Sequence, residues 1–355
     1  MQQPLVTDFI IVGQGLCGSW LSYYLTEAGA AVMVIDESRP NTASKAASGI
    51  INPVTGRRIV KTWLIDELMP IARHAYAAIA ESTGVAFLSE KEVIDCFSTP
   101  QMRLAFLDRF AKDSQYLSLP QDENDWLPLI NYDFGYGIIH PVYLVDILSL
   151  LQQRRALLKR KGCLLEESFV PGDLQHDAGQ VSYRHITAKT IIFCEGAAGF
   201  DNTFFPNLPF GLNKGEYLIV HIPGFPDTHI IKKGYTLVPM GEGKFWLGST
   251  YLWEFDNDQP TPGFLNFATN WLQQTLRMPF TVLDHQAAVR PATLERKPFV
   301  GMHPLHQTLG ILNGMGTKGC SLAPYFARQL AKHLLSGGPI QREADVQRFS
   351  RLLSK

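Results

Sequence analysis

The sequence predicts an α/β fold of two domains, one of them discontinuous along the chain. Three observations lead to this prediction. A strand, a glycine-rich turn, a helix and a second strand occupy residues 8–37, and the next strand suited to the same sheet is residues 190–194. A further strand, glycine-rich turn and helix follow at residues 310–335. This order predicts a Rossmann-type parallel sheet that an inserted, sheet-rich domain interrupts.

The composition indicates a globular protein with a neutral surface. Its 355 residues suit about two domains at about 150 residues each, and 46% of them are hydrophobic. The formal charge is −1, which excludes a broad electrostatic surface for nucleic acid or anionic lipid. The densest basic cluster, residues 159–161, is interpreted as a solvated helix end.

Targeting and metal signals are weak in this chain. The first apolar run, residues 9–12, is too short for a signal peptide, and no run approaches the roughly 20 apolar residues of a membrane span. The five cysteines are scattered without a CxxC pair, so we expect a reduced, cytoplasmic protein. His303 and His306 have a metal-like spacing but no nearby partner, and we therefore predict no metal site.

The N-terminal unit carries a dinucleotide fingerprint. Residues 8–12 form the predicted strand, and Gly13, Gly15 and Gly18 give the pattern GxGxxG before a helix with an apolar face. The first glycine allows a tight turn, the second a close approach to pyrophosphate, and the third close packing of helix and strand. The helix N-terminus offers free N–H groups to the phosphates.

An acidic residue after the second strand, residues 31–35, is expected to bind a ribose diol. Asp36 ends that strand and Glu37 follows it; either side chain could serve, and Asp36 is favoured. A nicotinamide-binding domain usually continues with a third strand soon afterwards. Here a small-residue stretch, residues 42–53, follows instead, and such a loop can lie along an extended ligand.

The C-terminal unit points a second helix N-terminus at the ligand. Residues 310–312 form a strand, residues 313–319 a glycine-rich turn, and residues 321–335 a helix. Reduced flavin is negative at its N1–C2=O edge, where fixed donors raise its electron affinity. Lys318 lies in this turn and either adds a positive charge at that edge or points to solvent.

Four segments together resemble the D-amino-acid oxidase-like FAD family, of glycine oxidase and sarcosine oxidase type. They are the fingerprint with Asp36 and Glu37, the loop 44–53, the strand pair 234–239 and 245–250, and the stretch from Arg290-Pro291 to Gly319. Residues 316–320 and 323–324 are more loosely similar to the oxidase half of the bifunctional tRNA wobble-uridine-modifying enzyme. The resemblance spans nearly the whole chain.

The resemblance implies a glycine-oxidase-like fold and a boundary for each domain. The FAD-binding domain is expected to comprise residues 1–84, 138–212 and 294–355, and the substrate domain residues 85–137 and 213–293. FAD is expected to be non-covalent, because Cys320 is not in the setting that binds flavin covalently in sarcosine oxidases.

By the same resemblance, the protein oxidises the C–N bond of a small amine, an amino acid or N-substituted glycine, by hydride transfer to flavin N5. Arg290 matches the arginine that binds the substrate carboxylate, and the alternative is that it only ties two domains together. Tyr251 matches a residue of the pocket wall, and Lys318 completes the catalytic set. Two other functions stay open: trimming of a carboxymethylamino group on tRNA, which the lack of basic surplus disfavours, and flavin binding without turnover.

The remaining predicted positions are those that contact the cofactor. They are Gly13, Gly15, Leu16, Gly18, Asp36, Glu37, Ser44, Ser48, Gly49, Ile50, Phe169, Glu195, Gly196, Gly314, Met315, Gly316, Thr317, Lys318 and Gly319.

Overall fold

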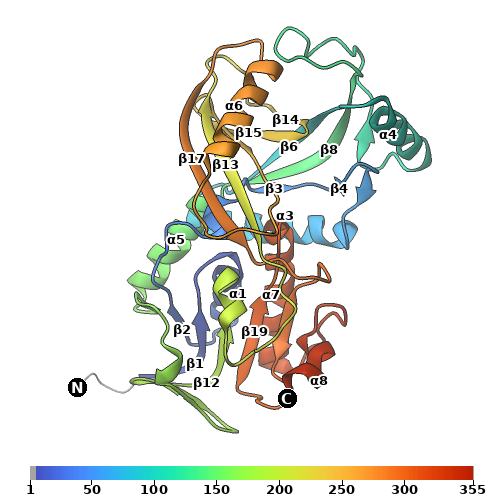
Figure 1. The fold of residues 1–355 in the computed structure, drawn as a ribbon. Helices are drawn as coiled ribbons and strands as arrows, with labels where there is room; N and C mark the ends of the chain where they lie inside the picture. The colour runs from blue at the N-terminus through green and yellow to red at the C-terminus, as the bar shows by residue number, and fades with distance from the viewer. Residues whose placement is uncertain (1–4, 355) are drawn as a thin grey trace.

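Two large sheets, one above the other in Figure 1, organise the chain. The computed structural model describes residues 5–354. The chain begins in the lower sheet, crosses to the upper sheet and returns twice, and so finishes in the lower sheet with β18 and β19. The predicted α/β class with an interrupted domain is confirmed.

The first sheet is the predicted Rossmann-type sheet. Its strands run in the order β10-β11-β12-β1-β2-β9, with β19 beside β12 and β18 beside β19. β1 pairs in parallel with β2 and β12, and β12 pairs in parallel with β19. The bounds are β1 (Leu5–Val12), β2 (Val32–Ile35), β9 (Leu164–Leu165), β10 (Leu174–His176), β11 (Val181–Tyr183), β12 (Ile186–Phe193), β18 (Phe299–Met302) and β19 (Leu309–Asn313).

The second sheet is mixed and comes mostly from the inserted segments. Its order is β17-β13-β16-β15-β14-β6-β8-β3, with β7 beside β8. Its bounds are β3 (Ile50–Ile51), β6 (Leu88–Cys96), β7 (Leu117–Ser118), β8 (Tyr136–Val145), β13 (Asn213–His221), β14 (His229–Lys233), β15 (Tyr235–Gly241), β16 (Lys244–Gly248) and β17 (Thr281–Arg290). A separate hairpin joins β4 (Val54–Thr55) to β5 (Val60–Lys61).

Eight α-helices and three short 3-10 helices lie within residues 5–354. The α-helices are α1 (Leu16–Glu27), α2 (Ala43–Ala46), α3 (Ile65–Thr83), α4 (Pro100–Lys112), α5 (Ile147–Arg160), α6 (Pro262–Thr275), α7 (Gly319–Ser336) and α8 (Ser350–Leu353). The 3-10 helices are η1 (Pro171–Asp173), η2 (Gly196–Asp201) and η3 (Val346–Phe349). The basic cluster at residues 159–161 closes α5, as predicted, and Lys159 forms an ion pair with Glu166 there.

Helix α1 packs against α7, so that the first and last parts of the chain share one core. Trp20 of α1 is buried, and its ring meets the edge of Tyr76 of α3 at a centroid distance of 5.0 Å. The Tyr76 hydroxyl donates to the carbonyl of Cys320 at the start of α7. Burial of such large aromatic side chains fixes the three helices against the first sheet.

The expected domain boundary at residue 138 falls inside β8, which pairs with the second sheet along its length. The division of the chain into the two domains stays a prediction.

We predict that Gly18→Ala destabilises the protein, because a Cβ at this position would lie 1.9 Å from the carbonyl oxygen of Gly13. We expect the free energy of unfolding to fall by about 3 kcal/mol, as overpacking of backbone on backbone requires. Urea denaturation measures it. Gly172→Ala is the matched control, since nothing lies within 4 Å of its added Cβ. Equal stability of the two variants would contradict the close approach.

Candidate active site

A single cavity of about 510 Å³ receives backbone turns from both ends of the chain. Residues 13 and 15–17, which follow β1, line it together with residues 315–317, 319 and 320 at the start of α7. The middle of the chain contributes residues 194–198, which follow β12. β13, β16 and β17 of the second sheet complete the wall. The cavity therefore lies between the two sheets.

The glycine turn after β1 leaves backbone donors for an anion. The first N–H that bonds within α1 is that of Ser19, which donates to the carbonyl of Gly15. The N–H of Leu16 donates to Ser44 Oγ at 3.1 Å, so the small-residue loop is tied to this turn. The remaining first-turn N–H groups precede any helical acceptor and suit a phosphate group.

Asp36 fixes the glycine turn against β2. Its carboxylate accepts the N–H of Gln14 at 2.8 Å and pairs with Arg155 at 2.6 Å. Glu37 lies next to it, in contact with Arg39 and Ser168. Both acids line the cavity, and Asp36 as the ribose ligand stays a prediction.

Glu195 is a half-buried residue that lines the same cavity. Burial raises the pKa of its carboxyl, and a hydrogen bond from Asn202 at 2.6 Å lowers it in part. The charged form of an acid in this setting would be stabilised by further hydrogen-bond donors, and Glu195 as a cofactor contact stays a prediction.

The second sheet supplies an aromatic wall. Tyr217 of β13 and Trp246 of β16 stack at a centroid distance of 5.4 Å. Their polar groups are already engaged: the Tyr217 hydroxyl donates to Gln286 at 2.6 Å, and the Trp246 indole N–H donates to the carbonyl of Ala46 at 3.1 Å. The rings therefore present apolar surface to the cavity and exclude water from it.

Arg290, the last residue of β17, brings a positive charge to this wall. Its guanidinium donates to Asn213 Oδ1, to Ser249 Oγ and to the carbonyl of Thr250. These three partners are neutral. Burial lowers the pKa of Arg290, although an arginine stays charged at any ordinary pH. A buried cation with neutral partners attracts an anion.

Most of the predicted site residues line this cavity, and four do not. The residues that do are Gly13, Gly15, Leu16, Asp36, Glu37, Ser44, Ser48, Gly49, Ile50, Phe169, Glu195, Gly196, Arg290, Met315, Gly316, Thr317 and Gly319. The four others are Gly18 and Gly314, which pack behind the two turns, and Tyr251 and Lys318.

Tyr251 and Lys318 lie just outside the cavity wall. Tyr251 is 50% exposed, and the guanidinium carbon of Arg290 lies 5.5 Å from its ring centroid. The ammonium of Lys318 donates to Thr62 Oγ1 at 3.2 Å, and burial lowers its pKa from 10.5 to about 8. Sequence analysis offered the flavin edge or solvent for Lys318, and the structure shows an interior position beside Thr62.

The thiols at the cavity are neutral. Cys17 and Cys320 both line it, and burial raises the pKa of each to about 12. The rings of His303 and His306 lie 4.7 Å apart, but within residues 5–354 no group of histidine, cysteine and acidic side chains is arranged to hold a metal ion. None of the described helices has the length and hydropathy to cross a membrane.

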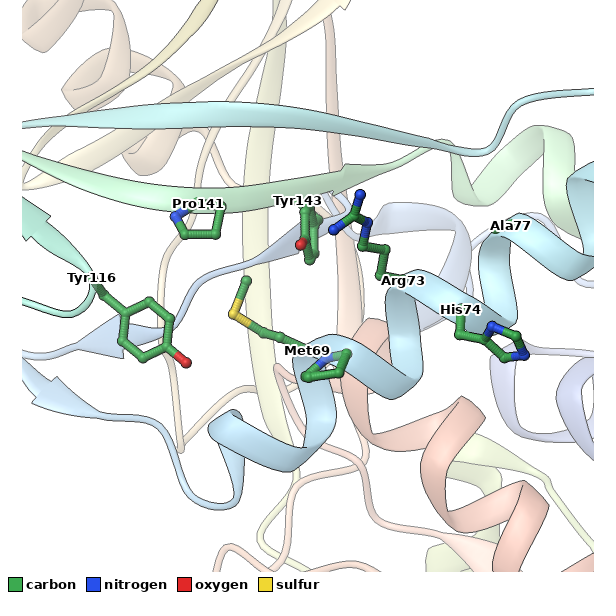
Figure 2. A pocket seen from close by; sticks show the side chains of 8 residues that line it. Met69, Arg73, His74, Ala77, Tyr116, Pro141 and Tyr143 are labelled. Carbon is green, nitrogen blue, oxygen red and sulfur yellow. The ribbon is translucent and has the colours of Figure 1, made fainter.

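A second cavity of about 500 Å³ lies between α3 and β8 (Figure 2). Arg73 and His74 on α3 and the rings of Tyr116 and Tyr143 surround it. No glycine is among its lining residues. The two glycine-rich motifs of the sequence line the cavity between the sheets instead.

Sequence analysis missed several residues of the large cavity or its support, and five of them contact Arg290 or lie near it on the second-sheet side of the cavity. They are Asn213, Gly215, Tyr217, Trp246 and Ser249. Strand alternation was a usable signal: residues 218 and 220 enter the core beneath α6, so residues 215 and 217 face the opposite side. The sequence alone did not show which of the two faces of β13 lines the cavity.

Comparison with known proteins places the chain in a family. The family "FAD dependent oxidoreductase" (DAO) matches residues 8–333. The uncharacterized oxidoreductase YurR of Bacillus subtilis (strain 168) is 42% identical and aligns with 96% of this chain and 98% of its own. Glycine oxidase of Pseudomonas putida is 23% identical, over 92% of this chain and 94% of its own. The structure of glycine oxidase from Bacillus cereus superposes with a TM-score of 0.79 at 18% identity, covering 95% and 99% of the two chains.

The chain therefore belongs to the FAD-dependent oxidoreductase family, which confirms the predicted enzyme class and cofactor. The site fits FAD on its own geometry. Gly13 and Gly15 line the cavity without side chains, so a pyrophosphate can approach their backbone. A Cβ on Gly13 would also lie 2.5 Å from the carbonyl oxygen of Cys194, which requires glycine there. The two glycine turns are the residues that would hold the cofactor.

We predict that Lys318 makes stability rise with pH in the alkaline range. Burial lowers its pKa to about 8 from 10.5. The cost of burying the charged ammonium is therefore complete below about pH 8 and disappears as the pH rises to 10.5. Relative to Lys318→Met, the wild type should gain about 1.4 kcal/mol of unfolding free energy per pH unit between these values. Urea denaturation of both proteins from pH 7 to 10.5 measures it. Parallel curves would contradict a buried, unneutralised lysine.

Proposed function

We propose that the protein oxidises the C–N bond of a small amine that carries a carboxylate, an amino acid or an N-substituted glycine. The observation that supports this most is Arg290, whose guanidinium lies in the cavity wall with neutral partners. A substrate carboxylate supplies the missing negative charge. The named relatives include two glycine oxidases, which agrees with a substrate of this class.

The chain's own residues would bind, orient and shield the substrate. Arg290 fixes the carboxylate end, and the faces of Tyr217 and Trp246 confine the body of the substrate in a space poor in water. Bound FAD supplies the electron acceptor for oxidation of the amine to the imine. Such a reaction needs a neutral amine in the right orientation, and no triad of catalytic side chains is required.

We propose that FAD is held without a covalent bond. The thiols of Cys17, Cys194 and Cys320 line the cavity, and burial raises the pKa of each, which keeps it protonated. Denaturation in acid should release all of the yellow colour into the supernatant.

Reduction of the purified yellow protein under anaerobic conditions tests the function. The panel consists of amino acids and N-alkyl glycines, each paired with the amine that lacks its carboxylate. Bleaching by carboxylated members supports the proposal. Bleaching only by tRNA that carries a carboxymethylamino group would favour the tRNA-trimming alternative, and no bleaching by any member would favour flavin binding without turnover.

We predict that Arg290→Ala raises the KM for a carboxylated substrate by roughly 100-fold, the effect of losing a charged hydrogen-bond pair. The KM for the matching amine without a carboxylate should change much less, because that amine makes no such contact. Steady-state kinetics on the matched pair measure the difference. Arg73→Ala, in the second cavity, is the control and should alter neither value. Equal losses on both substrates for Arg290→Ala would reduce Arg290 to a residue that ties two domains together.

A further inference from the structure

The guanidinium of Arg290 is held by three acceptors that carry no charge. Nη1 donates to Asn213 Oδ1 at 2.6 Å and to the carbonyl of Thr250 at 3.2 Å. Nη2 donates to Ser249 Oγ at 2.6 Å. Asn213 is fully buried, and its Nδ2 has no hydrogen-bond partner within residues 5–354. The groups that hold the Arg290 guanidinium, from Asn213, Ser249 and Thr250, are therefore polar but neutral.

Counting donors shows which part of the guanidinium remains for a ligand. Arginine has one N–H on Nε and two on each terminal nitrogen. The contacts above use both donors of Nη1 and one donor of Nη2. The donors left over are Nε–H and the second N–H of Nη2. Nε–H and the Nη2 N–H on the same side form one edge of a guanidinium, and this fork matches the two oxygens of a single carboxylate.

Backbone shape keeps the guanidinium in this place. Asn213, Gly215 and Tyr217 alternate along β13, which pairs with β17 so that Asn213 is opposite Arg290. A Cβ on Gly215 would lie 1.8 Å from Nη2 of Arg290, so the guanidinium lies directly on bare backbone. Any larger residue at 215 would displace it.

The neutrality of the groups that hold Arg290 matters for specificity. An aspartate at position 213 would be nearly the same shape as the asparagine, but it would pair with Arg290 and repel an incoming carboxylate. The amide orients the guanidinium without satisfying its charge. The chain thus keeps an oriented, unneutralised cation at the cavity wall.

We propose that Asn213 and Ser249 are positioning residues, which orient Arg290 and reserve one edge of its guanidinium for a single substrate carboxylate. The inference rests on the proposed function, because it requires that Arg290 binds the carboxylate. It goes further by assigning the selectivity for that carboxylate to the neutral residues behind Arg290.

Acetate binding to the FAD-loaded enzyme tests the inference without turnover. Acetate is titrated against the wild type, Asn213→Asp and Ser249→Ala, and the change in the visible flavin spectrum gives each Kd. We expect Asn213→Asp to raise the acetate Kd by about 10- to 100-fold and Ser249→Ala by about 3- to 10-fold. The KM of a carboxylated substrate should rise in parallel with kcat little changed, which a loss of folding would not produce.

Asn131→Asp is the matched control. Asn131 Oδ1 accepts a hydrogen bond from Arg277 Nε at 2.7 Å, outside the cavity, so the substitution adds the same charge beside another arginine. It should leave the acetate Kd unchanged. If Asn213→Asp does not retain flavin, Ser249→Ala carries the test alone, because Ser249 lies on the cavity wall.

The outcomes separate this inference from the proposed function. Weaker acetate binding in Arg290→Lys, with unchanged binding in both Asn213→Asp and Ser249→Ala, would overturn the positioning role and leave the proposed function standing. Unchanged acetate binding in Arg290→Lys would remove the carboxylate site itself. Weaker binding in all three, with an unchanged Asn131→Asp, supports the inference.

Discussion

The whole arrangement depends on the parallel pairing of β12 with β1 on one side and β19 on the other. In register, Val12 is opposite Phe193 and Phe193 is opposite Ile311. Three segments from the beginning, middle and end of the chain therefore leave the sheet at one level, and their turns meet above it. Without this pairing the two glycine-rich turns would have no common ligand. The cofactor site is thus a consequence of strand register in the first sheet. The segments inserted between these strands form most of the second sheet.

The second sheet supplies the wall on the other side of this cavity. Strand alternation sends one set of side chains of β13 and β16 into the core beneath α6 and the other set toward the cavity. The small-residue loop is bonded at both sides, through Ser44 to the glycine turn and through Ala46 to Trp246. One short segment thus links the glycine turn to the second-sheet wall of the cavity. Arg290, at the end of β17, adds a positive charge to the wall that carries Tyr217 and Trp246.

Sequence analysis predicted the first sheet well because its signals are local: buried strands, glycines required by close contacts, and an apolar helix face. The second half of the site was harder. Arg290 was predicted by resemblance. Asn213, Gly215 and Trp246 come together with it by strand pairing across distant segments, and alternation alone shows which residues share a face but not which face lines the cavity. Lys318 and Tyr251 show a further limit. Their positions in the chain were correct for the region, but the direction of a side chain in a turn depends on packing, and both lie outside the cavity wall.

The most direct measurement of the central claim is hydrogen exchange of the backbone amides with and without FAD. The account predicts that FAD slows exchange in two segments at once, residues 14–18 after β1 and residues 314–319 before α7, with one FAD bound per chain. Protection of only one segment, or of neither, would contradict the convergence of the two ends of the chain on one cofactor.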